Sequence, residues 1–543
     1  MVDDTPAPVG ERAARRHLVW ALVSLAYLAA SPYFPRLNNP NENVRVWMTR
    51  AIVEHHTLAI DRVVADWGYV DDKAISHGHL YSSKAPGTSL LGVPVLWLET
   101  RLWHLTGWPS PSKAATTFGL RLFSVVPGAL AFLFAFARWV ERRTRSPAAR
   151  DLLVCGLGLG TMLYPYGILF VGHAQGAMAA FGAFMALTWP PAGAAGEDAG
   201  AAAATPSPVR LAAAGALAGA SVLFEYQLVL VALVLGAYVA WRHRAATVWF
   251  VVGAMPFALA LGAYHTALFG RPWQFPYGHL ENQTYARVDH ARGFFGLAWP
   301  RLDALAASLF SVSYGLFAFS PFLLLGLAAA VWRGLGRQRA EALACLAATA
   351  TLSLFLAGMT HWRAGWCVGP RYIAGVAPFL AGGLVLAWGA WSRERHGHHV
   401  RALLGGLIIV SVFLNGVSAA LYPHYPEVYD NPVFDLALPL WRAGYAPSGL
   451  GHALGLAGRL ALLPVALAWA AAVAVALTTG ARRPWQVVAR LAAASLIGAA
   501  LLSALACYGR RPSAAEDHAT TVVRALWDPP PPTSAAPVSG SAR

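Results

Sequence analysis

The sequence contains few charged residues and few cysteines for its length. Among 543 residues there are 26 acids, three lysines and four cysteines. The cysteines are scattered and lack the spacing of a metal site or a disulfide framework (Cys155, Cys345, Cys367 and Cys507). No internal repeat is evident, and no stretch of the chain fits a soluble domain. The sequence therefore indicates neither a cysteine-based site nor a separate domain outside its hydrophobic part.

What the sequence has instead is a high apolar content: 57% of its residues are hydrophobic and the mean hydropathy is +0.48. Runs of about twenty apolar residues, each long enough to cross the hydrocarbon core of a bilayer, recur along nearly the whole chain. The first run, 20–34, follows a basic segment and precedes no small-residue cleavage site, so we expect a retained helix. We predict an all-α polytopic membrane protein with about 13 transmembrane helices.

The net charge of +15 does not indicate nucleic acid binding, because the arginines form short clusters between the apolar runs. This is the positive-inside pattern, which assigns the clusters to the cytoplasm. They lie at 138–150, 242–244, 333–339, 393–401 and 482–483. Arginine outnumbers lysine 38 to 3 and alanine is abundant, which indicates a high-GC bacterial genome. We therefore expect a multi-pass protein of the bacterial inner (plasma) membrane and no nucleic acid partner.

The same pattern divides the chain into a basic cytoplasmic segment (1–16), a membrane domain (17–507) and an external Pro-rich tail expected to be disordered (508–543). A low-complexity cytoplasmic linker is expected at 192–208. The expected external loops are 35–87, 270–307, 359–371 and 422–459.

The segment 86–105 is ambiguous. It and 116–137 cannot both cross the membrane if the arginine cluster at 138–150 is cytoplasmic. Glu99 and Arg101 make 86–105 the weaker span, so a re-entrant or interfacial segment is an alternative there.

The large first external loop concentrates the scarce charged residues beside the membrane. It contains six of the 26 acids, which are Glu42, Glu54, Asp61, Asp66, Asp71 and Asp72. It also contains two of the three lysines, Lys73 and Lys84. We expect short interfacial helices in this loop. Charges gathered at the surface of an otherwise apolar protein indicate chemistry there.

Three polar motifs lie on this predicted external face. The first loop ends in YSSKAPG (81–87), and a later loop contains GFFGLAWP (293–300) followed by SVSYGLFAFSP (311–321). The third motif is HWRAGWCVGPRY (361–372). Their position on one face is what a shared active site requires.

These motifs resemble those of a known family. The chain is similar to the GT-C superfold of integral-membrane glycosyltransferases, in the group related to protein O-mannosyltransferases and lipid A aminoarabinose transferases. That group closes its acidic first loop with a Lys-Pro-Pro-Gly/Leu motif, which SSKAPG matches with alanine at one proline. The residues that match its later Trp-x-x-Gly-Trp…Gly-Pro-Arg-Tyr motif are Trp362, Gly365, Trp366, Gly369, Pro370, Arg371 and Tyr372. The segment NPVFDLALPLWRAG (431–444) is also similar to this group.

The resemblance implies a polyprenyl-phosphate-linked sugar as donor and transfer on the periplasmic side. Such chemistry needs a carboxylate to take the acceptor proton and cations to stabilise the departing phosphate. Glu42 stands where the family has its catalytic acid, although this chain has Asn41-Glu42-Asn43 rather than an Asp-Glu pair. Asp72 is the second candidate base. The predicted phosphate-binding residues are Lys84, Arg371 and Arg363.

Further candidate substrate-binding residues are Asp61, Tyr81, His173, His361, Trp362, Trp366 and Tyr372. Each also has a plain structural interpretation, as an interfacial histidine, an aromatic-belt residue or a solvated acid. Glu225 lies near a break between two apolar runs, where a turn at the external surface is the plain explanation. The acids permit a divalent metal, but no ligand spacing requires one.

The sequence thus predicts a glycosyltransferase that moves a sugar from a polyprenyl phosphate to a cell-envelope acceptor, which is a lipid, a glycan or a protein. Two alternatives stay open. A flippase or transporter of a lipid-linked saccharide is disfavoured by the lack of repeats and by the few ionisable residues within the spans. An oligosaccharide ligase or polymerase would have its largest external loop late in the chain, whereas in this sequence the first is the largest.

Overall fold

The computed structural model describes residues 17–33, 39–107, 109–191, 205–289, 293–294, 296–336, 338–391, 397–481, 483–508 and 513–526. The predicted amino-terminal segment 1–16 and most of the predicted linker 192–208 and tail 508–543 lie outside these residues. What the sequence predicts for those segments stays a prediction.

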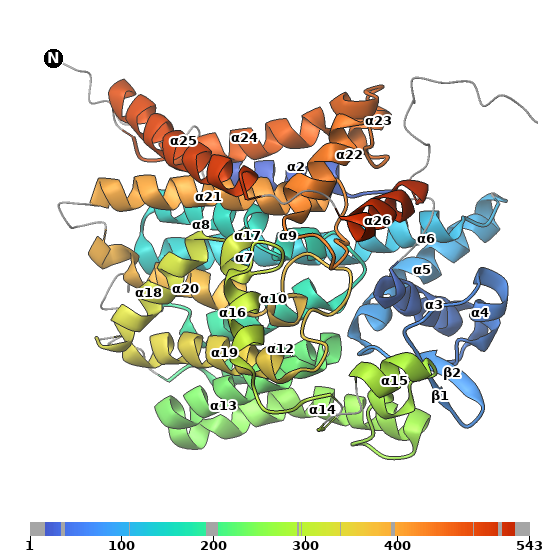
Figure 1. Cartoon of the computed structure of the whole chain (residues 1–543). Helices are drawn as coiled ribbons and strands as arrows, with labels where there is room; N and C mark the ends of the chain where they lie inside the picture. The colour runs from blue at the N-terminus through green and yellow to red at the C-terminus, as the bar shows by residue number, and fades with distance from the viewer. Residues whose placement is uncertain are drawn as a thin grey trace, which may run out of the picture.

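The described residues form a bundle of apolar helices (Figure 1). Its main helices are α2 (Leu18–Ala30), α7 (Val126–Thr144), α8 (Pro147–Leu159), α10 (Gly172–Thr188), α12 (Pro208–Phe224), α13 (Val229–His243), α14 (Thr247–Phe269), α18 (Phe322–Gly334), α19 (Arg339–Gly358), α20 (Val376–Trp391), α21 (Gly397–Ala420), α24 (Leu463–Thr478) and α25 (Pro484–Ala506). Shorter elements connect them: α9 (Leu163–Tyr166), η2 (Tyr226–Leu228), η3 (Arg244–Ala246), η4 (Pro276–His279), α15 (Gln283–Asp289), α16 (Leu302–Phe310), α17 (Leu316–Phe319), η5 (Arg371–Ile373), η6 (Val433–Ala437), α22 (Leu438–Arg442), α23 (Leu450–Ala453), η7 (Gly458–Leu462) and α26 (Ala514–Ala525).

By length and composition, six helical stretches of the described chain can cross a membrane. They are Lys113–Thr144, Tyr226–Phe269, Arg339–Gly358, His399–Ala420, Gly458–Thr478 and Pro484–Ala506. Four shorter apolar helices accompany them: Leu18–Ala30, Pro208–Phe224, Phe322–Gly334 and Val376–Trp391. The prediction of an all-α polytopic membrane protein is confirmed.

The ambiguous segment 86–105 forms a single helix, α5 (Gly87–Thr106), which packs against α3 (Pro40–His55) and α6 (Lys113–Leu120). It is not among the six membrane-crossing stretches, and Glu99 and Arg101 lower its hydropathy. After α6 the chain continues through a π-helical turn, η1 (Arg121–Val125), into α7. Such π-turns are frequent at functional sites, and η1 begins with a buried arginine.

The predicted first external loop contains α3, α4 (Asp61–Trp67) and a β-hairpin that the sequence does not predict. Strands β1 (Lys73–Ser76) and β2 (His79–Ser82) are antiparallel, and Lys73 pairs with Ser82. The turn residues His77 and Gly78 both have positive φ, at 50° and 81°, as a two-residue hairpin turn requires. In Figure 1 the hairpin, α3, α4 and α15 lie together at one end of the bundle, which we call the loop end.

Helix α3 has a well-defined start. The Asn39 side chain accepts a hydrogen bond from the backbone N–H of Asn41, and Pro40 occupies the first helical position, where its missing N–H is not needed. Although α3 belongs to the predicted first external loop, its first three turns are almost completely buried. This firm anchoring fixes the directions of the charged residues on α3.

Candidate active site

Glu42 and Arg45 lie one turn apart on α3, and both are buried, with 1% of each residue exposed. They point to different partners. Arg45 donates to the carbonyl oxygen of Asn41 at 2.8 Å and to Glu225 Oε1 at 3.0 Å. Glu42 instead contacts Arg121 at the start of η1. Helix α3 thus contributes to two separate ion pairs, Arg45 with Glu225 and Glu42 with Arg121.

The Glu42 carboxylate is fully engaged. It accepts hydrogen bonds from Arg121 Nε at 2.7 Å, from Arg121 Nη2 at 2.5 Å and from the backbone N–H of Phe170 at 2.7 Å. Arg121 Nη1 also donates to the carbonyl oxygen of Pro32 at 2.8 Å. Burial by itself raises the pKa of Glu42, but the charge and hydrogen bonds of Arg121 outweigh it and hold the pKa below its usual value. The ionised Glu42 carboxylate therefore links α3 to η1 and to the turn after α9.

Lys84 and Asp72 form the second ion pair, with Lys84 Nζ 2.9 Å from Asp72 Oδ1. The hairpin causes this contact, because Asp72 precedes β1 and Lys84 follows β2. Ser83 N and Oγ both donate to the Asp72 carbonyl oxygen, at 3.2 and 2.8 Å. The Lys84 and Asp72 side chains stay 14% and 18% exposed. Burial lowers the pKa of Lys84 more than the Asp72 carboxylate raises it.

Glu225 directly follows the last residue of α12, and one of its carboxylate oxygens contacts two side chains. Arg45 Nη2 lies 3.0 Å and His173 Nδ1 3.2 Å from Glu225 Oε1. His173 is buried at the start of α10, and its Nε2 has no hydrogen-bond partner among the described residues. Burial raises the pKa of Glu225, against the opposing charges of Arg45, Lys84 and Arg371.

Arg371 reaches the same region from the third motif. The loop before it turns through Ala364, Gly365 and Gly369, which have φ values of 63°, 72° and 60°. A Cβ at Gly369 would also lie 2.8 Å from Met162 Sδ, so the Met162 side chain would have to shift to admit it. The charge of Arg371 acts on Lys84, Arg45 and Glu225. Its Nε is buried and has no hydrogen-bond partner among the described residues.

Three cations and two carboxylates therefore converge from four parts of the chain. We call this the loop-end cluster, and its members are Arg45, Asp72, Lys84, Glu225 and Arg371. Tyr277 of η4 and Tyr372 border it, since the charges of Asp72 and Glu225 act on both phenols. The cluster carries one more positive than negative charge when all five groups are ionised, which suits an anionic ligand.

Several predicted residues lie elsewhere. Arg363 donates to the carbonyl oxygen of Glu427 at 3.1 Å and stacks near the rings of Tyr314 and Trp362. Asp61 supports the hairpin by accepting from the backbone N–H of Leu80 at 3.2 Å, with His79 at 3.4 Å.

The aromatic and histidine candidates also differ in their surroundings. Tyr81 packs edge-on against Phe269, Trp362 against Tyr314, and Trp366 is 38% exposed. The His361 carbonyl oxygen accepts from the N–H of Ala364 within the third motif. Tyr372, by contrast, lies edge-on to His173, with the ring centroids 6.3 Å apart.

Four participants were not among the sequence-predicted site residues: Arg45, Arg121, Glu225 and Tyr277. A signal existed for two of them. Arg121 is an ionisable residue within an apolar run, and Glu225 interrupts another run. Arg45 and Tyr277 have no comparable signal, because only the fold brings them to Glu225. The described residues contain no group of three or more His, Cys, Asp or Glu side chains that could hold a metal ion.

No family model matches the sequence, and no curated protein matches it. Among solved structures, the chain is similar to ArnT from Cupriavidus metallidurans bound to undecaprenyl phosphate, with a TM-score of 0.46, 14% identity, and coverage of 91% of this chain and 78% of that one. It is also similar to the Archaeoglobus fulgidus oligosaccharyltransferase (0.42, 13% identity, 79% and 58% covered) and to the arabinosyltransferase EmbB from Mycobacterium smegmatis (0.41, 12%, 92% and 42%).

By name, these solved structures include an oligosaccharyltransferase and an arabinosyltransferase, and ArnT was solved with undecaprenyl phosphate bound. At TM-scores below 0.5 the likeness is remote. It fixes neither the donor nor the acceptor nor the residues that act on them.

Proposed function

We propose that this protein is a glycosyltransferase that moves a sugar from a polyprenyl-phosphate-linked donor to a cell-envelope acceptor. The observation that carries the proposal is the loop-end cluster, in which Arg45 pairs with Glu225, Lys84 pairs with Asp72, and the charge of Arg371 acts on both pairs. Transfer of a sugar from a lipid phosphate needs cations at the phosphate and a carboxylate near the acceptor. The cluster supplies both beside a membrane-embedded bundle.

The cations act on the charge that develops on the donor phosphate. When the acceptor oxygen attacks the anomeric carbon, the bond from that carbon to the phosphate oxygen breaks and both electrons stay with the phosphate. The phosphodiester, with one negative charge, becomes a phosphomonoester that carries up to two. Lys84 and Arg371 are the groups that bind the leaving phosphate oxygen. Arg45, which is paired with Glu225, adds its charge to theirs. A single displacement of this kind inverts the anomeric carbon.

Asp72 is the base that we favour. In the structure its Oδ1 is paired with Lys84. A donor phosphate that binds Lys84 competes with that pair and releases the carboxylate to take the acceptor hydroxyl proton. Both side chains are partly exposed, so substrate can reach them.

We assign Glu42 a positioning role, because its ion pair with Arg121 uses both carboxylate oxygens and holds α3, which presents Arg45. Its predicted role as a base stays a prediction. His173 Nε2 and Arg371 Nε are buried polar atoms without partners among the described residues, and we assign them to sugar and phosphate oxygens respectively. With the arginine clusters in the cytoplasm, the loop end faces the periplasm of a bacterial inner membrane.

Transfer assays with single variants test this function. Purified full-length protein is incubated with radiolabelled polyprenyl-phosphate sugars and membrane extract, and label in the acceptor fraction is counted. K84A and R371A are each expected to lower transfer by about 100-fold or more, the usual loss when a transition-state donor is removed. R442A, which removes an exposed arginine from α22, is the matched control and keeps wild-type transfer. Full activity in both K84A and R371A would overturn the assignment.

A further inference from the structure

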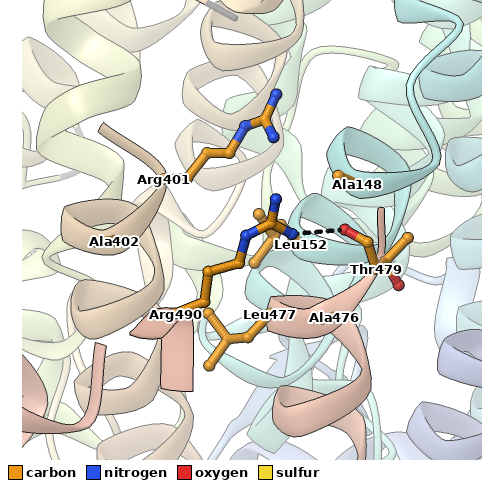
Figure 2. Close-up of a pocket in the computed structure, with 8 residues that line it drawn as sticks. All are labelled: Ala148, Leu152, Arg401, Ala402, Ala476, Leu477, Thr479 and Arg490. Atoms are coloured by element: carbon orange, nitrogen blue, oxygen red, sulfur yellow. Dashed lines mark hydrogen bonds between the residues drawn. The ribbon is translucent and has the colours of Figure 1, made fainter. Parts of the chain in front are cut away.

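A second group of cations lies far from the loop-end cluster, at the opposite end of the bundle. There the turn from α7 to α8, the start of α21 and the turn from α24 to α25 meet around a shallow pocket that is partly open to the surroundings. Arg401, Arg490 and Thr479 supply its polar atoms (Figure 2). Its apolar wall consists of Ala148, Leu152, Ala402, Ala476 and Leu477.

In Figure 2 the side chains of Arg401 and Arg490 extend in a similar direction, and the charge of Arg401 acts on Arg490. Arg490 Nη1 donates to the Thr479 carbonyl oxygen at 3.1 Å. Arg401 Nε is buried and has no hydrogen-bond partner among the described residues. Two like charges at one pocket, with a buried donor that has no partner, are features that suit an anion.

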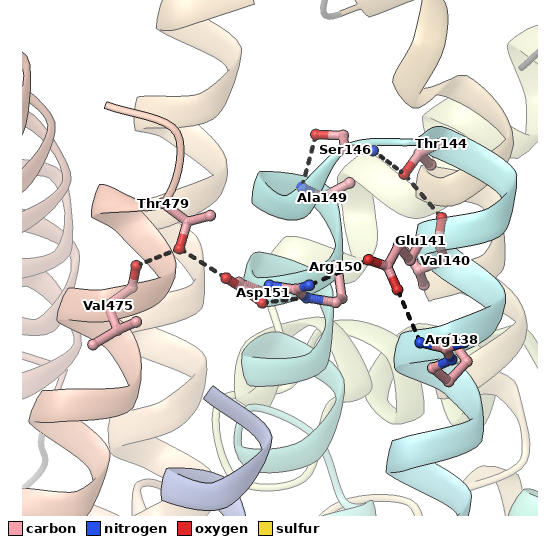
Figure 3. A network of polar contacts seen from close by, with 10 residues as sticks. All are labelled: Arg138, Val140, Glu141, Thr144, Ser146, Ala149, Arg150, Asp151, Val475 and Thr479. Carbon is pink, nitrogen blue, oxygen red and sulfur yellow. Dashed lines mark hydrogen bonds and ion pairs between the residues drawn. The ribbon is translucent and has the colours of Figure 1, made fainter. Parts of the chain in front are cut away.

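The acids near the pocket are already paired. Asp151 is the carboxylate that touches a pocket residue, since its Oδ2 lies 2.7 Å from Thr479 Oγ1. Its other oxygen accepts from Arg150 Nε at 2.7 Å, and Arg150 Nη1 lies 3.5 Å from Glu141 (Figure 3). This network joins α7 and α8 to the end of α24. Because Asp151 is engaged with Arg150 and Thr479, it does not neutralise the charges of Arg401 and Arg490.

The position of the pocket indicates what the anion is attached to. Helix α25 is one of the apolar stretches, and its outer side chains Trp485 and Val488 are 61% and 65% exposed. A tryptophan at the end of an apolar helix is typical of the membrane–water interface. Arg490 follows Trp485 by five positions, about 7.5 Å further into the apolar helix, and its long side chain can extend back toward the lipid headgroups. Leu152 and Leu477 continue the pocket toward the apolar side.

We propose that this pocket binds a phosphate group, and that at this position the phosphate belongs to the headgroup of an anionic phospholipid. Arg401 and Arg490 hold the phosphate oxygens, and the leucines contact the first part of an acyl chain. The arginine-rich end is the cytoplasmic end by the positive-inside rule, so the lipid comes from the inner leaflet. This site is separate from the loop-end cluster and does not depend on sugar transfer.

Native mass spectrometry of the purified full-length protein tests this proposal, because it counts lipids bound to folded protein only. Dihexanoyl phosphatidylglycerol, dihexanoyl phosphatidylcholine and inorganic phosphate are titrated in separate samples. We expect phosphatidylglycerol to bind wild-type protein at least tenfold more tightly than phosphatidylcholine. R401Q/R490Q should abolish that difference, whereas R401K/R490K, which keeps both charges, should retain most of it.

The matched control is R142Q/R483Q, which removes two exposed arginines from the same end and leaves the pocket intact. Its affinity for phosphatidylglycerol should stay within about twofold of wild type. Inorganic phosphate that binds as tightly as phosphatidylglycerol, and is lost in R401Q/R490Q, would support the phosphate site and overturn the lipid assignment. Equal losses in R401Q/R490Q and R142Q/R483Q, or no loss in either, would overturn the whole proposal.

Discussion

Lys84 Nζ lies 2.9 Å from Asp72 Oδ1, at the open end of a hairpin whose first strand begins at Lys73 and whose second strand ends at Ser82. The pair is partly exposed, and the charges of Arg45 and Arg371 act on the lysine. A cation already paired with a carboxylate can exchange that partner for a phosphate. This exchange leads to a prediction for each member of the pair.

The first prediction concerns the base. D72N keeps the size of the side chain but cannot take a proton, so transfer should fall by about 100-fold to 10,000-fold. The donor phosphate should bind at least as well as in wild type, because Lys84 loses its competing anion. Transfer rate and donor binding are measured on the same preparation. A D72N protein with the wild-type rate would exclude Asp72 as the base.

The second prediction is a pH dependence of donor binding. The pKa of Lys84 is lowered, chiefly by burial, so the lysine loses its charge at a pH below the usual value of about 10.4. The KM for the donor should therefore rise as pH increases toward that value. K84R stays charged throughout and should flatten the profile. Profiles of wild type and K84R that rise in parallel would assign the titration to another group.

The third prediction concerns the Glu42–Arg121 ion pair. Removing one partner of a buried pair leaves the other charge unpaired and costs about 3–5 kcal/mol. E42A should therefore lower the thermal unfolding temperature strongly. E54A, which breaks the Arg50–Glu54 pair one helical turn apart near the surface, should change stability by about 0.5 kcal/mol. Equal unfolding temperatures for the two variants would contradict the anchoring role.

Acid should weaken the same anchor. The pKa of Glu42 is lowered in the folded protein, so its contribution is complete above the unfolded value of about 4.3 and is lost as pH falls through the lower folded pKa. Unfolding temperature is recorded between pH 7 and 3 for wild type and E42Q. Wild type should lose more stability than E42Q as the pH falls toward 3, because only wild type has a carboxylate to protonate at this position. An identical loss in both would assign the acid sensitivity to other carboxylates.

The fifth prediction concerns a close approach of two backbones. A Cβ at Gly87 would lie 2.6 Å from the carbonyl oxygen of Leu223, two residues before Glu225. G87A should push the segment that bears Lys84 away from Glu225 and lower transfer without changing any charge. G128A is the matched control, because nothing lies within 4 Å of a Cβ there. Transfer is compared at equal amounts of folded protein, and equal rates for both variants would show that this approach does not matter.

Much of the architecture could be predicted because its causes are local. Apolar runs and arginine clusters indicate a helical membrane protein without any knowledge of packing, and the first loop and the external motifs indicate Asp72, Lys84 and Arg371. The hairpin escaped prediction because four-residue strands leave almost no periodic pattern. Arg45 and Tyr277 could not be assigned, because only the folded chain brings Arg45 into contact with Glu225 and Tyr277 within the influence of its charge. Arg363 lies in the same motif as Arg371 but points to Glu427, a difference that sequence spacing does not contain.

The most direct test of the central claim follows the two halves of the donor separately. Wild-type protein in vesicles receives a polyprenyl-phosphate sugar that carries ³H in the sugar and ³²P in the phosphate, together with membrane extract. We predict that ³H moves to the acceptor fraction while ³²P stays with the polyprenyl lipid, and that K84A prevents this separation. If both labels cross the membrane together and stay on one molecule, the protein is a transporter of the lipid-linked sugar, and the proposed sugar transfer is contradicted.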